Sequence, residues 1–464
     1  MNKLLKTIVV FWILIPVVLK AQPVTWQKWY DYNNDDNEGE DVIQTFDGGY
    51  LFLGQNYSSF NNGIVLIKTD QNGTVQWKKL IGRDSANGAD IISLSVCQVP
   101  DSGFVLSGYD YPSAYLLKIN KYGNIVWIRK YSKPGFEIRF YDHKLTFDGG
   151  IITCGDIYSP LKAYVAKIDS SGIIEWDNSY NANDFIKVLQ SRDSNYYFAR
   201  YNYLVKTDSK GRVIWDRGFF RGGPYMVENV SGYLFSGGSA GVDTMYLNKF
   251  DASGNLMWGK KFYPSAYCYS ICMSLDGSLL LAGYADSLSM GIIAVAKVDM
   301  NGNEIFTKQI LSTIGNNLSF LPFSVKSTTD SGFIMTGFTN YGGFPTRDNI
   351  LAVKTDSKCN APLITGIINI SVLIPNEIVL YQNFPNPFNP STKIKYQLSK
   401  RGFVNLRIYD AKGMEICQLV NQFQTSGQFE ILFNAANYGL ASAVYFLRLE
   451  VDEIIETRKM LLLK

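Results

Sequence analysis

The chain has 464 residues and a nearly balanced charge, with 44 Lys and Arg against 41 Asp and Glu and a single His. Between residues 22 and 372 there are 31 basic and 33 acidic side chains, a net charge of about −2. Proteins that bind nucleic acids need a basic face to neutralise phosphates. We therefore expect no nucleic-acid partner.

The N-terminal residues have the pattern of a secretory signal peptide. Lys3 and Lys6 precede an almost wholly apolar run from Ile8 to Leu19, and Ala21 offers a small residue for cleavage. A retained anchor is the alternative, but the run is too short to span a bilayer comfortably. We predict a signal peptide over residues 1–21 and no transmembrane segment in the mature chain.

A repeat with the core Lys-x-Asp-x-x-Gly-x-x-x-Trp follows. Its complete copies begin at Lys68, Lys118, Lys167, Lys206, Lys249 and Lys297, and a truncated seventh copy begins at Lys354. The constant distance from Lys to the aromatic residue indicates a hairpin in which Asp or Asn and Gly reverse the chain.

A second hairpin motif precedes each copy, as in DGGYLFLG from Asp47 to Gly54 and DSGFVLSG from Asp101 to Gly108. Each unit thus predicts four short strands, and the units recur about every 48 residues, the period of a β-propeller blade. We predict an all-β chain in which residues 22–360 form a seven-bladed β-propeller.

The segment from Trp26 to Tyr30, WQKWY, resembles the Trp strand that the seventh repeat lacks. We expect it to supply the fourth strand of the last blade. This pairing closes the ring and removes two exposed sheet edges.

The repeated residues are better interpreted as scaffold than as an active site, because a Trp recurring once per blade is suited to packing between sheets. The pattern also resembles the repeats of quinone-cofactor propellers, but the further site residues of such enzymes are not found in this sequence. We therefore expect no cofactor.

Function is expected in the loops at one rim of the ring, where the blades differ. These loops are rich in Tyr, Phe, Asn and Gly, a composition suited to stacking on sugars or anchoring a protein. The candidate binding residues are Tyr57, Tyr109, Tyr111, Tyr158, Tyr201, Tyr225, Tyr267, Tyr284 and Tyr341. We predict a binding or adhesion module for a glycan or protein; the alternative is a polysaccharide-degrading enzyme that uses rim carboxylates.

Other reactive residues give weaker signals. His143 lies in a strand-like context, so we expect a packing role and no catalytic residue. The acidic segment from Asp31 to Asp41 has enough oxygen ligands for Ca²⁺ but lacks the EF-hand spacing, and a solvated turn is favoured. Six Cys residues in an exported chain permit disulfides, but their positions do not resemble a disulfide framework. We expect Cys97 and Cys272 to be small buried hydrophobes and not to form bridges.

The C-terminal residues form a separate unit. Pro385, Pro387 and Pro390 require an extended segment from Asn383 to Thr392. Alternating polar and apolar residues then predict strands over 393–398 and 404–409. We predict a linker over 361–377 and a small antiparallel β-sandwich over 378–464.

The motifs NFPNPFNPST (Asn383 to Thr392), VNLRIYDAKGMEI (Val404 to Ile416), AVYFLRLE (Ala443 to Glu450) and TRKMLLLK (Thr457 to Lys464) resemble the C-terminal sorting domain of the type IX secretion system. One departure is Ala443, where the family usually has Gly. The resemblance implies export through the periplasm and across a Gram-negative outer membrane, with the secretion machinery as partner. The product would be secreted or held on the outer cell surface, where anchoring to lipopolysaccharide is an option.

Overall fold

A computed structural model describes residues 24–32, 35–57, 63–82, 91–158, 160–219, 221–239, 244–287, 290–310, 318–341, 348–362, 378–398, 402–424, 427–452 and 454–463. Contacts divide the chain into two compact units, Met1–Thr365 and Gly366–Lys464. The predicted signal peptide and residues 363–377 of the predicted linker lie outside the described residues, so these boundaries stay predictions.

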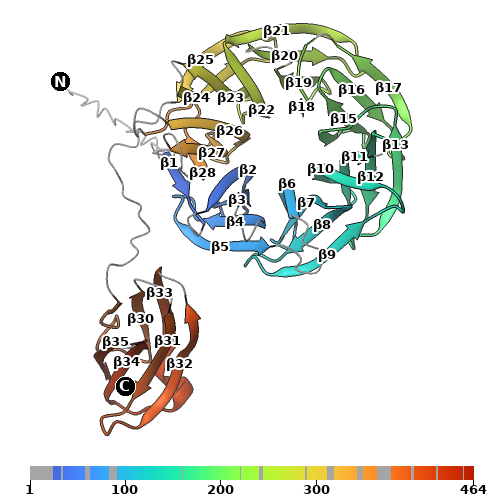
Figure 1. Cartoon of the computed structure of the whole chain (residues 1–464). Helices are drawn as coiled ribbons and strands as arrows, with labels where there is room; N and C mark the ends of the chain where they lie inside the picture. The colour runs from blue at the N-terminus through green and yellow to red at the C-terminus, as the bar shows by residue number, and fades with distance from the viewer. Residues whose placement is uncertain are drawn as a thin grey trace, which may run out of the picture. The chain divides into compact units, whose positions relative to one another are not determined.

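The described part of the first unit forms seven four-stranded antiparallel sheets, the blades of a propeller (Figure 1). Blade 1 consists of β2 (Asp36–Gln44), β3 (Tyr50–Tyr57), β4 (Gly63–Thr69) and β5 (Val75–Gly82). Blade 2 consists of β6 (Ile91–Gln98), β7 (Phe104–Asp110), β8 (Ser113–Ile119) and β9 (Ile125–Tyr131). Blade 3 consists of β10 (Glu137–Leu145), β11 (Ile151–Tyr158), β12 (Lys162–Ile168) and β13 (Ile174–Tyr180). Blade 4 consists of β14 (Lys187–Gln190), β15 (Tyr196–Arg200), β16 (Tyr203–Thr207) and β17 (Val213–Gly218). Blade 5 consists of β18 (Tyr225–Glu228), β19 (Leu234–Gly238), β20 (Thr244–Phe250) and β21 (Leu256–Pro264). Blade 6 consists of β22 (Ala266–Met273), β23 (Leu279–Ser287), β24 (Met290–Val298) and β25 (Glu304–Ile310).

Blade 7 joins the two ends of the ring. It consists of β26 (Leu318–Ser327), β27 (Phe333–Tyr341), β28 (Asp348–Thr355) and the N-terminal strand β1 (Trp26–Tyr30), in the order β1-β28-β27-β26. The antiparallel register runs from Trp26 opposite Lys354 to Tyr30 opposite Ile350. The predicted closure by residues 26–30 is therefore confirmed.

The first strand of each blade lies innermost (Figure 1), and these strands contact one another in the closed order β2, β6, β10, β14, β18, β22, β26. Two buried carboxylates link neighbouring blades there. Asp41 of β2 accepts hydrogen bonds from Ser324 Oγ of blade 7 at 2.7 Å and Val96 N of blade 2 at 3.3 Å. Asp142 of β10 accepts from Ser95 Oγ of blade 2 at 2.9 Å and from Val188 N of blade 4 at 3.1 Å.

The Lys of the repeat forms an ion pair within its own blade. Its partner is the Asp of the preceding turn: Lys68–Asp47, Lys118–Asp101, Lys167–Asp148, Lys206–Asp193, Lys297–Asp276 and Lys354–Asp330, with N–O distances from 2.5 to 3.0 Å. Blade 5 has Ser231 in place of this Asp, and Lys249 lies instead 4.1 Å from the centre of the Tyr233 ring.

The Trp of the repeat packs on the Gly of the next blade. A Cβ atom at Gly73 would lie 2.9 Å from the Trp26 ring, and Gly73 also has a φ of +71° that favours glycine. Trp26 Nε1 donates to Gln71 O at 3.1 Å. Trp77 and Gly123 make the same contact between blades 1 and 2. The constant distance between Gly and Trp in the repeat therefore places both residues at interfaces between neighbouring blades.

The second unit is a small β-sandwich with its own core. One sheet has the order β29 (Val379–Leu380), β30 (Ser391–Leu398), β33 (Gly427–Asn434), and the other has the order β32 (Glu415–Gln424), β31 (Gly402–Tyr409), β34 (Ala443–Val451), β35 (Ile454–Leu462). A 3₁₀ helix, η1 (Ala435–Tyr438), follows β33. Alternate residues of β30 and β31, among them Ile394 and Leu406, are fully buried between the sheets. Ala443, in place of the usual Gly, has no left-handed φ and so fits without backbone strain.

The proline-rich segment is held against the last strand by its asparagines. Asn386 Oδ1 accepts a hydrogen bond from Leu461 N at 2.8 Å, and Asn386 Nδ2 donates to Lys459 O at 3.1 Å. Asn383 is 1% exposed and donates to Thr392 Oγ1 at 2.9 Å. The asparagine side chains thus supply hydrogen bonds that the neighbouring prolines cannot donate.

No helix in the described part of the chain is long and apolar enough to cross a membrane. All six Cys residues have free thiols, and Cys154, Cys268, Cys272 and Cys359 are buried. Cys272 is buried as predicted, whereas Cys97 is only partly so and contacts His143.

Candidate functional site on the loop face of the propeller

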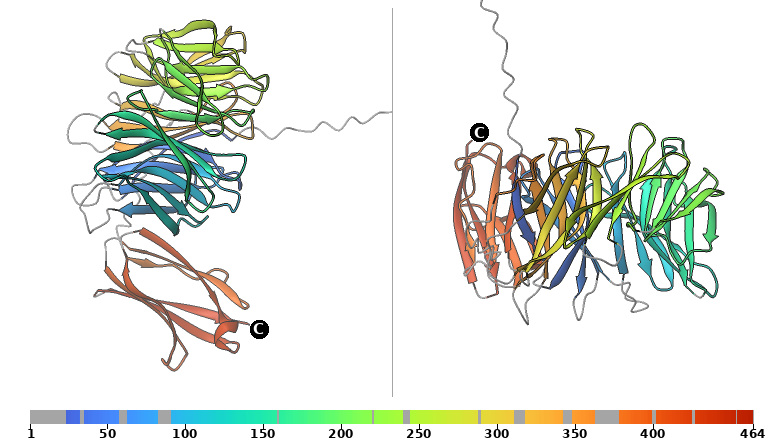
Figure 2. Two further views of the ribbon diagram at one scale, coloured as in Figure 1. Left: turned by 90° about the vertical axis from the view of Figure 1, so that its right-hand side faces the viewer. Right: turned by 90° about the horizontal axis from the view of Figure 1, so that it is seen from above.

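Antiparallel order places two sets of connections at the same end of every blade. These are the turns from the second to the third strand and the connections from the fourth strand to the next blade, and we call this end the loop face. Figure 2 shows the propeller from its edge, with the strand ends on two opposite faces. The other end, which carries the Asp-Gly turns of the repeat, is the turn face.

The predicted tyrosines all belong to the loop-face ends of their strands or turns. Tyr57, Tyr111, Tyr158 and Tyr201 are between 43% and 50% exposed. Tyr109, Tyr225, Tyr267 and Tyr284 are half-buried. Tyr341 ends β27, but its side chain lies outside the described residues. Their role in binding a ligand stays a prediction.

Several of these rings contact one another. The ring centres of Tyr109 and Tyr111 are 5.2 Å apart in a T-shaped arrangement. Those of Tyr267 and Tyr284 are stacked at 5.8 Å. The first pair joins the end of β7 to the turn that follows it, and the second pair joins two neighbouring strands of blade 6.

Sequence reasoning missed Tyr141, Tyr269 and Phe323, which extend these pairs toward the centre of the ring. Each lies at a β-bulge of an inner strand, where the register shifts by one residue. The ring centres of Tyr141 and Tyr109 are 6.4 Å apart, and those of Tyr269 and Phe323 are 5.8 Å apart. A bulge leaves its residue unpaired, so the alternation of a regular strand gives no signal for these positions.

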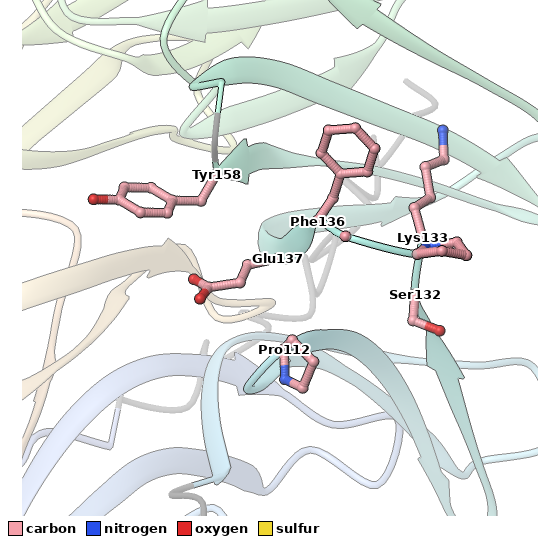
Figure 3. A pocket seen from close by; sticks show the side chains of 8 residues that line it. Pro112, Ser132, Lys133, Phe136, Glu137 and Tyr158 are labelled. Carbon is pink, nitrogen blue, oxygen red and sulfur yellow. The ribbon is translucent and has the colours of Figure 1, made fainter.

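A pocket of about 540 Å³ opens on the loop face between blades 2 and 3. Its lining includes Pro112 of the β7–β8 turn, Phe136 and Glu137 of the connection to β10, and Tyr158 at the end of β11. Figure 3 shows the Glu137 carboxylate between the Tyr158 ring and Pro112. Ile138 N donates to Pro112 O at 3.0 Å, which fixes the two walls relative to each other.

The Tyr158 ring is supported on one side. The Arg139 guanidinium lies 5.3 Å from its centre and also 6.0 Å from that of Tyr141. Asp156, whose side chain is 4% exposed, accepts from Arg139 Nε at 2.9 Å and from Tyr141 OH at 2.8 Å. Asp156 thus keeps Arg139 against one face of the Tyr158 ring. The other face of this half-exposed ring is available to a ligand.

Glu137 adds a hydrogen-bond acceptor to this pocket. Among the described residues, its carboxylate has no hydrogen-bond or ion-pair partner. The neighbouring Lys133 is paired with Asp177 at 2.6 Å and does not neutralise it. The pocket thus combines apolar walls with one available carboxylate.

His143 is buried and contacts two residues of blade 2. It lies in β10, is 0% exposed, and its Nδ1 and Nε2 lie 2.8 Å from Ser107 Oγ and 3.1 Å from Cys97 Sγ. Ser107 is also fully buried, so a substrate cannot reach this pair.

Burial, together with the charge of Lys144, lowers the pKa of His143 to about 4. Below about pH 6.5 an unfolded chain protonates this imidazole and the folded chain does not, so stability is lost as the pH falls from 6.5 toward 4. We expect His143→Gln to remove up to about 3 kcal/mol of this pH dependence. Denaturant titrations of both proteins across this window measure it, and a difference between them that is constant with pH would contradict the assignment.

The acidic segment differs from the expected turn. Asp36 to Asp41 belongs to strand β2, where successive side chains point to opposite faces. Residues 33–34 lie outside the described residues. Among those described, no group of three or more His, Cys, Asp or Glu side chains is arranged to hold a metal ion. Calcium binding therefore gains no support from the geometry of β2.

Comparison with known proteins identifies the second unit. Residues 382–463 match the family described as the secretion system C-terminal sorting domain. No curated protein matches the chain.

Solved structures show weaker similarity. The WD40 domain of Neurospora crassa Pan2 is 10% identical, with a TM-score of 0.45 over 73% of this chain and 100% of that one. Chaetomium thermophilum Sqt1, bound to the N-terminus of ribosomal protein L10, is 9% identical, with a TM-score of 0.47 over 71% and 98%. PorZ of Porphyromonas gingivalis, a surface component of the type IX secretion system, is 12% identical, with a TM-score of 0.32 over 92% and 81%.

The family match coincides with the sandwich in which the proline-rich segment is clamped to the last strand. The C-terminal domain is therefore a sorting domain of the type IX secretion system, and it marks the chain for export to the cell surface or for secretion.

Proposed function

We propose that the propeller is the binding module of this exported protein and that it holds a glycan on its loop face. The observation that carries the proposal is the pocket between blades 2 and 3, where the free face of Tyr158 lies beside the available Glu137 carboxylate. A sugar ring has apolar C–H faces that stack on an aromatic ring and hydroxyl groups that donate to a carboxylate. A volume of about 540 Å³ is within the usual range for ligand sites.

The surrounding surface favours a polymer over a single sugar. The exposed Tyr111 and the half-buried Tyr109 and Tyr141 continue the aromatic surface from this side of the ring toward its centre. Aromatic side chains give a large contact area at a low cost in conformational entropy. A chain of several sugars could therefore contact more than one ring at a time.

Replacing Tyr158 by Ala tests the proposal after a glycan array has identified a ligand for the purified protein. We expect binding to weaken about tenfold, which corresponds to ~1.4 kcal/mol, because one stacking surface is lost. Tyr122→Ala is the matched control, since Tyr122 is 61% exposed but lies in a turn-face hairpin. Isothermal titration calorimetry measures both variants.

Two outcomes would overturn the glycan proposal. One is the absence of any glycan ligand together with binding of a surface protein. The other is an equal effect of the two Tyr substitutions. Release of reducing ends from a bound polysaccharide would replace the binding module by the hydrolytic alternative.

A further inference from the structure

A second cavity lies on the axis of the propeller. Its volume is about 90 Å³, room for roughly three water molecules. Six of the seven inner strands line it, through Glu40, Asp41, Asp142, Lys144, Lys187, Val188, Leu189, Tyr225, Met226, Ser270, Ile271, Phe323, Ser324 and Lys326. The cavity is therefore built jointly by blades on opposite sides of the ring.

Two carboxylates and two ammonium groups in this cavity are already engaged. Asp41 and Asp142 hold neighbouring blades together, as described above. Lys144 directs its three donors at Asp142 Oδ1, Asp142 Oδ2 and His143 O, at distances between 2.9 and 3.1 Å. Lys326 is paired with Asp41 at 3.2 Å. These groups hold the walls of the cavity together. All three donors of Lys144 are used within the protein, so Lys144 has none left for a ligand.

Lys187 is different. Among the described residues, no oxygen lies within hydrogen-bonding distance of its ammonium group, and the closest carboxylate contact is Asp142 at 3.9 Å. Its side chain is 30% exposed and lies 5.9 Å from the centre of the Tyr225 ring. A cation on a cavity wall without a hydrogen-bond acceptor is available to an anion from outside.

Glu40 is a second charged group of this cavity that has no hydrogen-bond partner among the described residues. It occupies the bulge of β2, where the register shifts between Gly39 and Asp41. Burial and the neighbouring Glu38 raise the pKa of Glu40 to about 7, while Lys187 acts in the opposite direction. Near neutral pH the carboxyl group therefore exchanges between a hydrogen-bond donor and an anion.

We propose that this cavity receives the carboxylate of an acidic sugar, with Lys187 as its ion-pair partner and the carboxyl group of Glu40 as a hydrogen-bond partner. The inference rests on the proposed glycan-binding function and names the class of glycan. The cavity has room for the carboxylate of a sugar but not for its ring. The sugar ring then stays outside the cavity, whose lining includes the aromatic side chains of Tyr225 and Phe323.

The arrangement predicts the sign of the pH dependence. As the pH rises through 7, Glu40 loses its proton and repels a bound carboxylate, so affinity should fall by up to about tenfold per pH unit above that point. The charged and titratable groups that face Glu40 are Glu38, Asp41, Tyr57, Asp142, Lys144, Lys187, Tyr225 and Lys326. Asp41 and Asp142 have pKa values held below the usual range: burial opposes this, but lysine charges and hydrogen bonds outweigh it. Neither of these two aspartates gains or loses a proton near pH 7.

The test compares an oligosaccharide of galacturonic acid, which carries a carboxylate on each sugar, with its uncharged methyl ester. We expect the full-length protein to bind the acid at least tenfold more tightly than the ester near pH 6. Lys187→Gln should remove this preference, and Glu40→Gln should remove the pH dependence while keeping a group that can donate a hydrogen bond. Lys260→Gln, on the outer strand of blade 5, is the matched control, and thermal melting of each variant checks its fold.

Each other outcome would overturn the inference. Equal binding of acid and ester would reject a carboxylate site while leaving the glycan proposal intact. Tighter binding at high pH would indicate an amine ligand on ionised Glu40. Equal binding of a poly-glutamate peptide would indicate an acidic protein as the partner. If neither sugar polymer binds and the array finds no other glycan, the proposed function fails as well.

Discussion

Deleting residues 378–464 should abolish export and leave the propeller in the periplasm. The deleted residues comprise the whole sorting domain, whose core is formed by residues of the sandwich alone. The hydrophobic clusters of the propeller lie between neighbouring blades and contain no residue of the sandwich, so the shortened protein should fold and resist proteolysis. Immunoblots of the medium, outer membrane and periplasm measure the distribution, and we expect more than tenfold less protein outside the cell.

Two point substitutions in the full-length chain show whether export depends on the folded sorting domain or only on the presence of these residues. Leu447→Asp places a charge at a fully buried position of the sandwich and should block export like the deletion. Lys412→Ala changes an exposed turn residue and should be exported normally. Normal recovery of the protein without residues 378–464 in the medium would refute the sorting assignment for this chain.

Removing β1 should destabilise the propeller more than any single surface change. A chain that begins at Asp31 loses the five-residue ladder to β28 and the buried Trp26 and Tyr30. It also loses the hydrogen bond from Tyr30 OH to Gly73 O of blade 1, at 2.8 Å. The exposed edge of β28 invites pairing with other molecules, so we expect a much lower melting temperature and aggregation on heating.

A matched pair of Trp substitutions isolates the contribution of ring closure. Trp26→Ala should cost about 3–5 kcal/mol, the usual range for removing a buried Trp. Trp77→Ala removes the same kind of contact between blades 1 and 2, but Trp77 is half-buried. Its strand β5 is also joined to its partner β4 by a turn of the chain, whereas β1 pairs with β28 from the other end of the propeller. We expect a smaller loss of melting temperature for Trp77→Ala. Equal losses, or unchanged melting and solubility without residues 1–30, would contradict closure through β1.

The sequence predicted the architecture because each repeat contains both partners of an interface. The interval from Lys68 to Trp77 specifies a hairpin whose Lys pairs within the blade and whose Trp packs on the next one. The orphan segment Trp26 to Tyr30 could be assigned because it matches the missing part of the last repeat. Periodic sequence thus determined the number of blades and the way in which the ring closes.

The candidate site was predictable only in part. The loop-face tyrosines could be placed because they lie near the ends of strands, or in the turns between them, that the repeats predict. Tyr141 and Glu40 could not, since a bulge turns one residue out of the alternation that sequence analysis relies on. The pocket depends on Pro112 and Tyr158, which belong to different blades, and no local pattern shows that two such residues meet.

The position of β28 has a mechanical consequence. It is the last strand of the propeller before the C-terminal domain, yet it lies between β27 and β1 and not at the edge of its sheet. Traction applied through the C-terminal domain therefore meets hydrogen-bonded ladders on both sides of this strand. A pulling force must break both ladders before β28 can leave the sheet. The N-terminal strand β1 therefore protects the propeller against mechanical unfolding that starts from its C-terminal strand.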